Sequence, residues 1–106
     1  MKMTASPAGE PPARGFPAAD SSKWPHERVA SEDAEVARLI VVNLLAAMGE
    51  RGVRGVARDA GINEKTLRRL IAGASYPDVR TVARLEDALG VSLYPPWPRA
   101  AAVIRE

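Results

Sequence analysis

Apolar residues recur at intervals of three and four along four stretches of the chain, and this spacing predicts four amphipathic helices. The first stretch runs from Val36 to Met48, after Ser31 as a capping residue and a turn rich in acids, which the positive end of a helix dipole favours. It carries more apolar residues than one buried face needs, the additional ones being Val41, Val42 and Leu45. They indicate a helix surrounded by a bundle, or one that packs on another element or another chain.

Two short helices joined by a tight turn are predicted between residues 53 and 72. The packed side of the first holds Val53, Val56, Ala57 and Ala60. Gly61 follows at once, and glycine adopts a left-handed backbone conformation without steric cost, so it is suited to end this helix. Asn63 then offers a side-chain oxygen that can cap the next helix.

The second helix of this pair has one packed side and one polar, mostly basic side. The packed side holds Thr66, Leu67, Leu70 and Ile71, and the polar side holds Glu64, Lys65, Arg68 and Arg69. A short helix of this kind fits a DNA groove.

A fourth helix is predicted from a cap at Asp78 to Leu89, where Gly90 ends it. Its inward residues are Val79, Val82, Leu85, Ala88 and Leu89. Val91 and Leu93 come next, and we expect them to close the edge of the bundle.

The two ends of the chain lack this periodicity. Residues 1–30 are rich in proline and alanine, which predicts a disordered or loosely attached tail, although Phe16 and Trp24 are suited to dock on the domain or on a partner. Residues 94–106 form a Pro/Trp segment followed by a short C-terminal helix, and we expect Tyr94 and Trp97 to pack on the bundle. The domain itself is predicted over residues 31–93.

Composition narrows the function classes further. The chain has 106 residues, no cysteine and one histidine, His26, so neither a disulfide framework nor a metal site is expected, and we expect no cofactor. No nucleophile and base pair or phosphate-binding glycine loop is present, which argues against an enzyme. No apolar run approaches the length of a membrane span, so we expect no membrane contact and a cytoplasmic, nucleoid-associated protein.

Basic residues are concentrated in one part of the chain. The formal net charge is only +2, but residues 49–72 contain six basic and three acidic residues. A face that binds phosphates needs such an excess. A solvated surface with an arginine bias explains it equally well.

The pattern of small, turn and apolar residues resembles that of a known family. Ala57 and Gly61, four residues apart, are accompanied by the apolar residues Val56, Ile62, Leu67 and Leu70. On these residues, the segment 36–93 resembles the Cro/repressor (XRE-like) type of helix-turn-helix domain found in phage repressors and small bacterial regulators. The resemblance implies an all-α fold, a small four- to five-helix bundle of the phage-repressor-like type with a disordered N-terminal tail. The second helix of the motif then crosses over Ala57.

The resemblance also implies a set of DNA contacts. Base contacts fall to Glu64, Lys65 and Arg69, whereas contacts to the DNA backbone or its flanks fall to Arg51, Arg54, Arg58, Asn63 and Arg68. Family members often carry glutamine where this chain has Val53 and Arg54, so only Arg54 is available for that backbone contact. Glu64 has an alternative partner in Arg68, and Arg58 has alternative partners in Asp59 and Glu50.

These observations favour a sequence-specific regulator of transcription that binds double-stranded DNA as a homodimer, because one such domain covers only a half-site. The alternative is an antitoxin-like or accessory module that uses the N-terminal tail to bind a partner protein.

Overall fold

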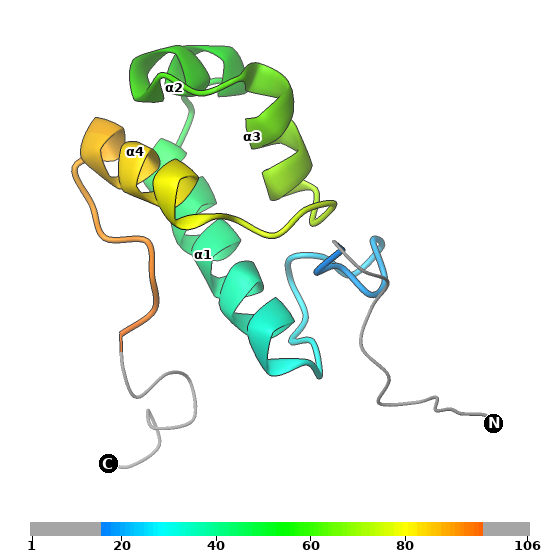
Figure 1. Cartoon of the computed structure of the whole chain (residues 1–106). Coiled ribbons are helices and arrows are strands. Elements are labelled where there is room, and N and C mark those ends of the chain that lie inside the picture. The colour runs from blue at the N-terminus through cyan, green and yellow to red at the C-terminus, as the bar shows by residue number, and fades with distance from the viewer. Residues whose placement is uncertain (1–15, 97–106) are drawn as a thin grey trace, which may run out of the picture.

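The computed structural model describes residues 16–96, which hold four α-helices and no strand (Figure 1). They are α1 (Glu32–Met48), α2 (Val53–Ala60), α3 (Glu64–Ile71) and α4 (Val79–Leu89). The predicted all-α bundle is confirmed, and its fifth helix, predicted after residue 98, lies outside the described residues together with Trp97. None of the helices within residues 16–96 is both long and apolar enough to cross a membrane.

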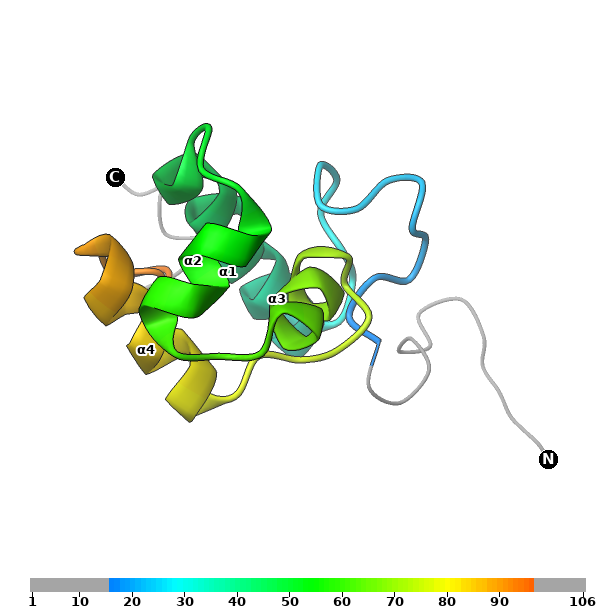
Figure 2. The same cartoon turned by 90° about the horizontal axis from the view of Figure 1, so that it is seen from above.

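The long helix α1 lies beneath the three shorter ones, of which α2 packs on both α3 and α4 (Figure 2). The core between them consists of side chains with at most 2 % exposure, among them Ile40, Leu44, Leu67, Leu70 and Leu85. Leu93 is fully buried as predicted, and two hydrogen bonds fix its backbone. Its N–H donates to Glu86 Oε2 at 2.7 Å, and its carbonyl accepts from Asn43 Nδ2 at 2.8 Å. The chain after α4 is thereby tied back to α1.

Four residues predicted to face inward or to pack on the bundle are exposed, and Tyr94, at 43 %, is one of them. Val79 is 74 % exposed because the buried side of α4 follows Thr81, Val82 and Leu85, and the first turn places Val79 off that side. Val91 is 40 % exposed, since the chain buries Leu93 instead. Thr66 is exposed because Leu67 and Leu70 define the packed side of α3.

The additional apolar residues of α1 were expected either inside the bundle or against another element or chain, and they do not all lie in the same environment. Val41 is fully buried in the bundle, whereas Val42 and Leu45 are each 37 % exposed. The start of this helix also differs from the prediction: Ser31 occupies the N-cap position, but its hydroxyl donates to Asp33 and makes no cap hydrogen bond.

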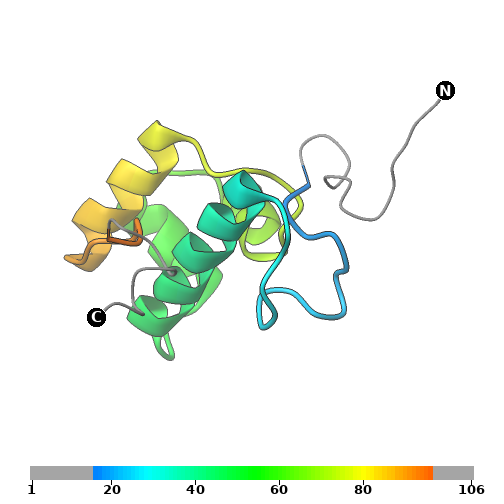
Figure 3. The same ribbon diagram turned by 90° about the horizontal axis from the view of Figure 1, so that it is seen from below.

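Residues 16–30, which we call the N-terminal arm, lie against the domain beside α1 and the end of α3 (Figure 3). Trp24 is 8 % exposed and its indole Nε1 donates to the Ile71 carbonyl at 2.8 Å, while Pro17 is fully buried. Docking on the domain is therefore what the structure shows for Trp24, whereas Phe16 remains 44 % exposed. The packed fold begins at Pro17, before the predicted boundary at residue 31, and residues 1–15 lie outside the described residues.

A partly buried ion pair on α1 holds the other end of the arm. Glu35 accepts from Arg38 Nη2 at 2.7 Å and from the Val29 amide at 3.0 Å, and Arg38 Nη1 donates to the Pro25 carbonyl at 3.0 Å. Burial alone would raise the pKa of Glu35, but the hydrogen bonds from Arg38 and from the Val29 amide outweigh it, so this pKa lies below its ordinary value. Both side chains are used to fasten the arm.

Candidate nucleic-acid interface

The turn between α2 and α3 depends on Gly61. Gly61 has a φ of 71°, in the left-handed region, and its N–H donates to the Arg58 carbonyl at 3.1 Å. The next amide, of Ile62, donates to the Ala57 carbonyl at 3.0 Å, and the Ile62 side chain packs half-buried against the core. Ala57 is 2 % exposed in the contact between α2 and the rest of the core. The two helices are therefore separate and joined by a sharp turn.

Two anchors fix the orientation of α3. Asn63 Oδ1 accepts from the Lys65 amide at 2.7 Å and so caps its N-terminus. Leu67 and Leu70, at 0 % and 2 % exposure, fix its packed side. The opposite side, with Lys65 and Arg69 one turn apart, is consequently turned to solvent.

Lys65 and Arg69 differ from the other predicted contact cations in having no charge partner. Within residues 16–96, neither side chain makes an ion pair or a hydrogen bond. The remaining four are each paired with a carboxylate. These are Arg51, Arg54, Arg58 and Arg68. The outward side of α3 therefore carries two uncompensated positive charges.

Glu64 is shared by two arginines from different helices. It accepts from Arg68 at 2.9 Å (Nε) and 2.6 Å (Nη2), and Arg54 Nε of α2 lies 3.5 Å from its other oxygen. The hydrogen bond from Arg68, followed by the charges of Arg68 and Arg54, lowers the pKa of Glu64 and keeps it ionised. Arg68, the alternative partner expected for Glu64, is therefore its partner in the structure. A contact between this carboxylate and a base stays a prediction.

Asp59, near the end of α2, gathers two further arginines. Arg58 Nε lies 3.5 Å from one of its oxygens, and Arg51 Nη2 donates to the other. The pairing of Arg58 with Asp59 was one of its expected alternatives. The pairing of Arg51 was not expected, because the two residues are eight positions apart and meet only once the turn before α2 has formed.

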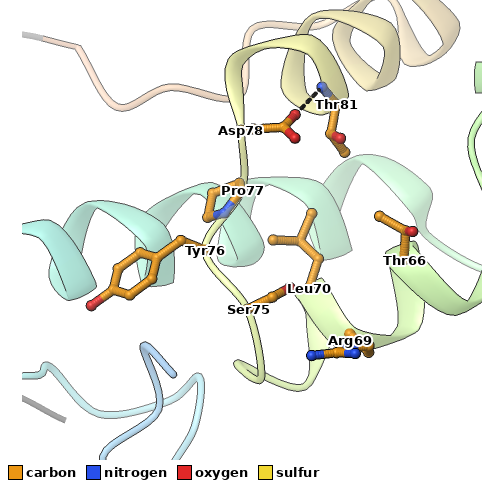
Figure 4. Close-up of a pocket in the computed structure, with 8 residues that line it drawn as sticks. All are labelled: Thr66, Arg69, Leu70, Ser75, Tyr76, Pro77, Asp78 and Thr81. Carbon is orange, nitrogen blue, oxygen red and sulfur yellow. Dashed lines mark hydrogen bonds between the residues drawn. The ribbon is translucent and has the colours of Figure 1, made fainter. Parts of the chain in front are cut away.

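A hollow of about 270 Å³ opens beside Arg69, between α3, the following loop and the first turn of α4 (Figure 4). It is lined by Thr66, Arg69, Leu70, Ser75, Tyr76, Pro77, Asp78 and Thr81. Sequence reasoning missed Thr66 and the loop hydroxyls as neighbours of Arg69. The spacing of Thr66 and Arg69, three residues apart on one helix, could have indicated that they are neighbours. Nothing in the sequence indicates that the following loop returns toward α3.

Comparison with known families agrees with this geometry. A family model described as helix-turn-helix matches residues 50–95, which span α2, α3, α4 and the buried Leu93. This segment belongs to the Cro/C1-type helix-turn-helix family. No curated protein matches the chain.

The helix-turn-helix domain is of a DNA-binding type, and the resemblance seen in the sequence is confirmed. The match begins after α1, so α1 and the N-terminal arm lie outside the matched segment. In this helix-turn-helix, α2 and α3 carry five of the six basic residues of segment 49–72, and Arg51 lies two residues before α2. The two without a charge partner among the described residues are on α3.

Proposed function

We propose that this helix-turn-helix protein is a sequence-specific regulator of transcription that inserts residues 63–72 into the major groove of double-stranded DNA. The observation that carries the proposal is the pair of exposed, unpaired cations on α3, Lys65 and Arg69. Their spacing of one turn matches a helix that reads successive base edges. Lysine and arginine donate well to guanine O6 and N7, which favours a half-site containing G·C pairs.

The paired arginines suit the phosphates on either side of this helix. Arg54 and Arg68 are 86 % and 59 % exposed, and exposed ion pairs contribute little to stability, so exchanging Glu64 for phosphate oxygens costs little. Arg51 and Arg58 likewise form ion pairs with Asp59 that phosphate oxygens can replace. In this arrangement Arg54 and Arg68 release Glu64, whose carboxylate can then accept from a cytosine amino group, and Asn63 lies at the entry of the helix into the groove.

Selection of bound sequences from random duplexes, repeated at two salt concentrations, tests the proposal. A defined sequence should emerge at both, and Arg69→Ala should relax the preference at one base pair by about 1 to 3 kcal/mol. The matched variant Arg54→Ala should weaken binding to all duplexes and reduce the salt slope by about one. Recovery of random sequence, or an Arg69→Ala variant whose preferences equal those of the parent, would reject the recognition role.

The protein is further proposed to act as a homodimer on the cytoplasmic nucleoid. Support for the dimer comes from α1, where the apolar side chains of Val42 and Leu45 lie about one turn apart and are each 37 % exposed. A second copy of the chain can cover them. The alternative of a partner-binding tail has less support, because Trp24 is already buried against the end of α3.

A further inference from the structure

The C-terminal turn of α3 is closed by hydrogen bonds from two sources. The first source is the chain directly after the helix: Ala74 N donates to the Arg69 carbonyl at 2.9 Å, and Gly73 N donates to the Leu70 carbonyl at 3.1 Å. This is the Schellman arrangement. It leaves the Ile71 carbonyl, which accepts instead from Trp24, 47 residues away in the sequence, at 2.8 Å.

The backbone at Gly73 is shaped to receive the N-terminal arm. Gly73 has a φ of +74°, and a Cβ there would lie 2.6 Å from Ala18 Cβ and 2.7 Å from Trp24 Cε2. Its carbonyl also accepts from the Ala18 amide at 3.1 Å. The arm thus reaches the end of α3 through a close contact that only glycine permits.

The two unpaired cations of α3 are therefore fixed from opposite ends. Lys65 lies in the first turn, whose geometry Asn63 sets through its cap hydrogen bond. Arg69 lies in the last turn, where its carbonyl accepts from the Ala74 amide. Two residues further along, the Ile71 carbonyl accepts from Trp24, and these bonds together close the turn. A helix of eight residues is too short to hold its last turn without such contacts.

We propose that Trp24 is a positioning residue for Arg69: the N-terminal arm fixes the last turn of α3 and thereby supports the base preference that Arg69 provides. This rests on the proposed function. Without the indole donor the last turn frays, and part of the binding free energy is spent on ordering it again. Lys65, which is held from the other end, is unaffected.

A double-mutant cycle on the full chain tests this coupling. Trp24→Phe keeps an aromatic ring beside Gly73 and removes the N–H donor, and folding of each variant is checked by circular dichroism at the binding temperature. The preference at the base pair read by Arg69 should fall about fivefold, the equivalent of one hydrogen bond. In the Arg69→Ala background, Trp24→Phe should cause no further loss of preference at the base pair read by Arg69. The base pair read by Lys65 is identified as the one whose preference Lys65→Ala removes, and the preference there should be the same in Trp24→Phe as in the parent. An equal loss at both base pairs, or additive effects of Trp24→Phe and Arg69→Ala, would overturn the positioning role.

Amide hydrogen exchange of the free protein tests the same coupling without DNA. In Trp24→Phe the amides of Ala72 and Ala74, which donate to the Arg68 and Arg69 carbonyls, should exchange about fivefold faster. The Leu67 amide, which donates to the Asn63 carbonyl in the first turn, should keep its rate. Unchanged exchange at Ala74, or equal acceleration at Leu67, contradicts the inference. A protein that selects no sequence but shows the local acceleration would contradict the proposed function alone.

Discussion

Replacing Gly73 by alanine should destabilise the fold far more than the same replacement at Gly90. Both glycines end a helix with similar left-handed φ values, +74° at Gly73 and +70° at Gly90. An added Cβ at Gly90 meets no atom within 4 Å, whereas at Gly73 it meets Ala18 Cβ at 2.6 Å and Trp24 Cε2 at 2.7 Å. The pair of variants therefore separates the cost of the backbone conformation from the cost of displacing the arm.

The expected magnitudes follow from these two contributions. The left-handed conformation costs a non-glycine residue about 1 to 2 kcal/mol, offset by about 0.4 to 1 kcal/mol from the stiffer unfolded chain. Gly90→Ala should therefore lose about 1 kcal/mol. Gly73→Ala adds the cost of overpacking against a buried ring, about 1 to 3 kcal/mol, for a total of about 2 to 4 kcal/mol. The overpacking contribution is bounded by the complete loss of the Trp24 contacts, about 3 to 5 kcal/mol.

Urea unfolding followed by far-ultraviolet circular dichroism measures both losses on the full chain. Gly73→Ala should unfold at a clearly lower urea midpoint than Gly90→Ala, with a similar slope. Equal losses in the free energy of unfolding would contradict this prediction, because they would mean that the arm does not rest on the end of α3 in solution.

The remaining predictions concern the ion pair under the arm and the oligomeric state. Because the folded-state pKa of Glu35 is lowered, its contribution to stability is present above its unfolded pKa, near the ordinary value of 4.5, and is lost as the pH falls through the lowered value. Glu35→Gln should therefore be less stable than the parent at pH 7 and should lose less stability between pH 5 and pH 2; parallel acid unfolding curves would contradict this. Sedimentation equilibrium at tens of micromolar should show a dimer that Leu45→Glu converts to a monomer, whereas a strict monomer with and without DNA would contradict the proposed homodimer.

Much of the bundle was predictable because its determinants are local. The bounds of α2 and α3 follow from periodic apolar residues, from Gly61 as a stop and from Asn63 as a cap, all within twenty residues of sequence. The exposure of Lys65 and Arg69 follows from the same periodicity, since Leu67 and Leu70 fix the buried side. Residues at the edge of an apolar stripe were predicted less well, as Thr66 and Val79 show, because a small shift in packing decides their exposure.

The arm was not predictable in the same way because its contacts are long-range. Nothing in the proline-rich composition around Trp24 indicates a hydrogen bond to Ile71, and a glycine at position 73 by itself indicates only that a helix can end there. The ion pairs of Arg51 with Asp59 and of Arg54 with Glu64 likewise depend on how α2 lies relative to its neighbours. Such contacts require the assembled fold.

The proposed function depends on contacts between the outward side of α3 and base edges in the major groove. Its most direct test uses the selected duplex with one guanine, at the position assigned to Arg69, replaced by 7-deazaguanine. This change removes the N7 acceptor in the major groove and leaves base pairing and the minor groove intact. The parent protein should bind the modified duplex about five- to tenfold more weakly than the unmodified one, and Arg69→Ala should bind both duplexes equally. Equal binding of both duplexes by the parent protein would contradict the proposed base contacts.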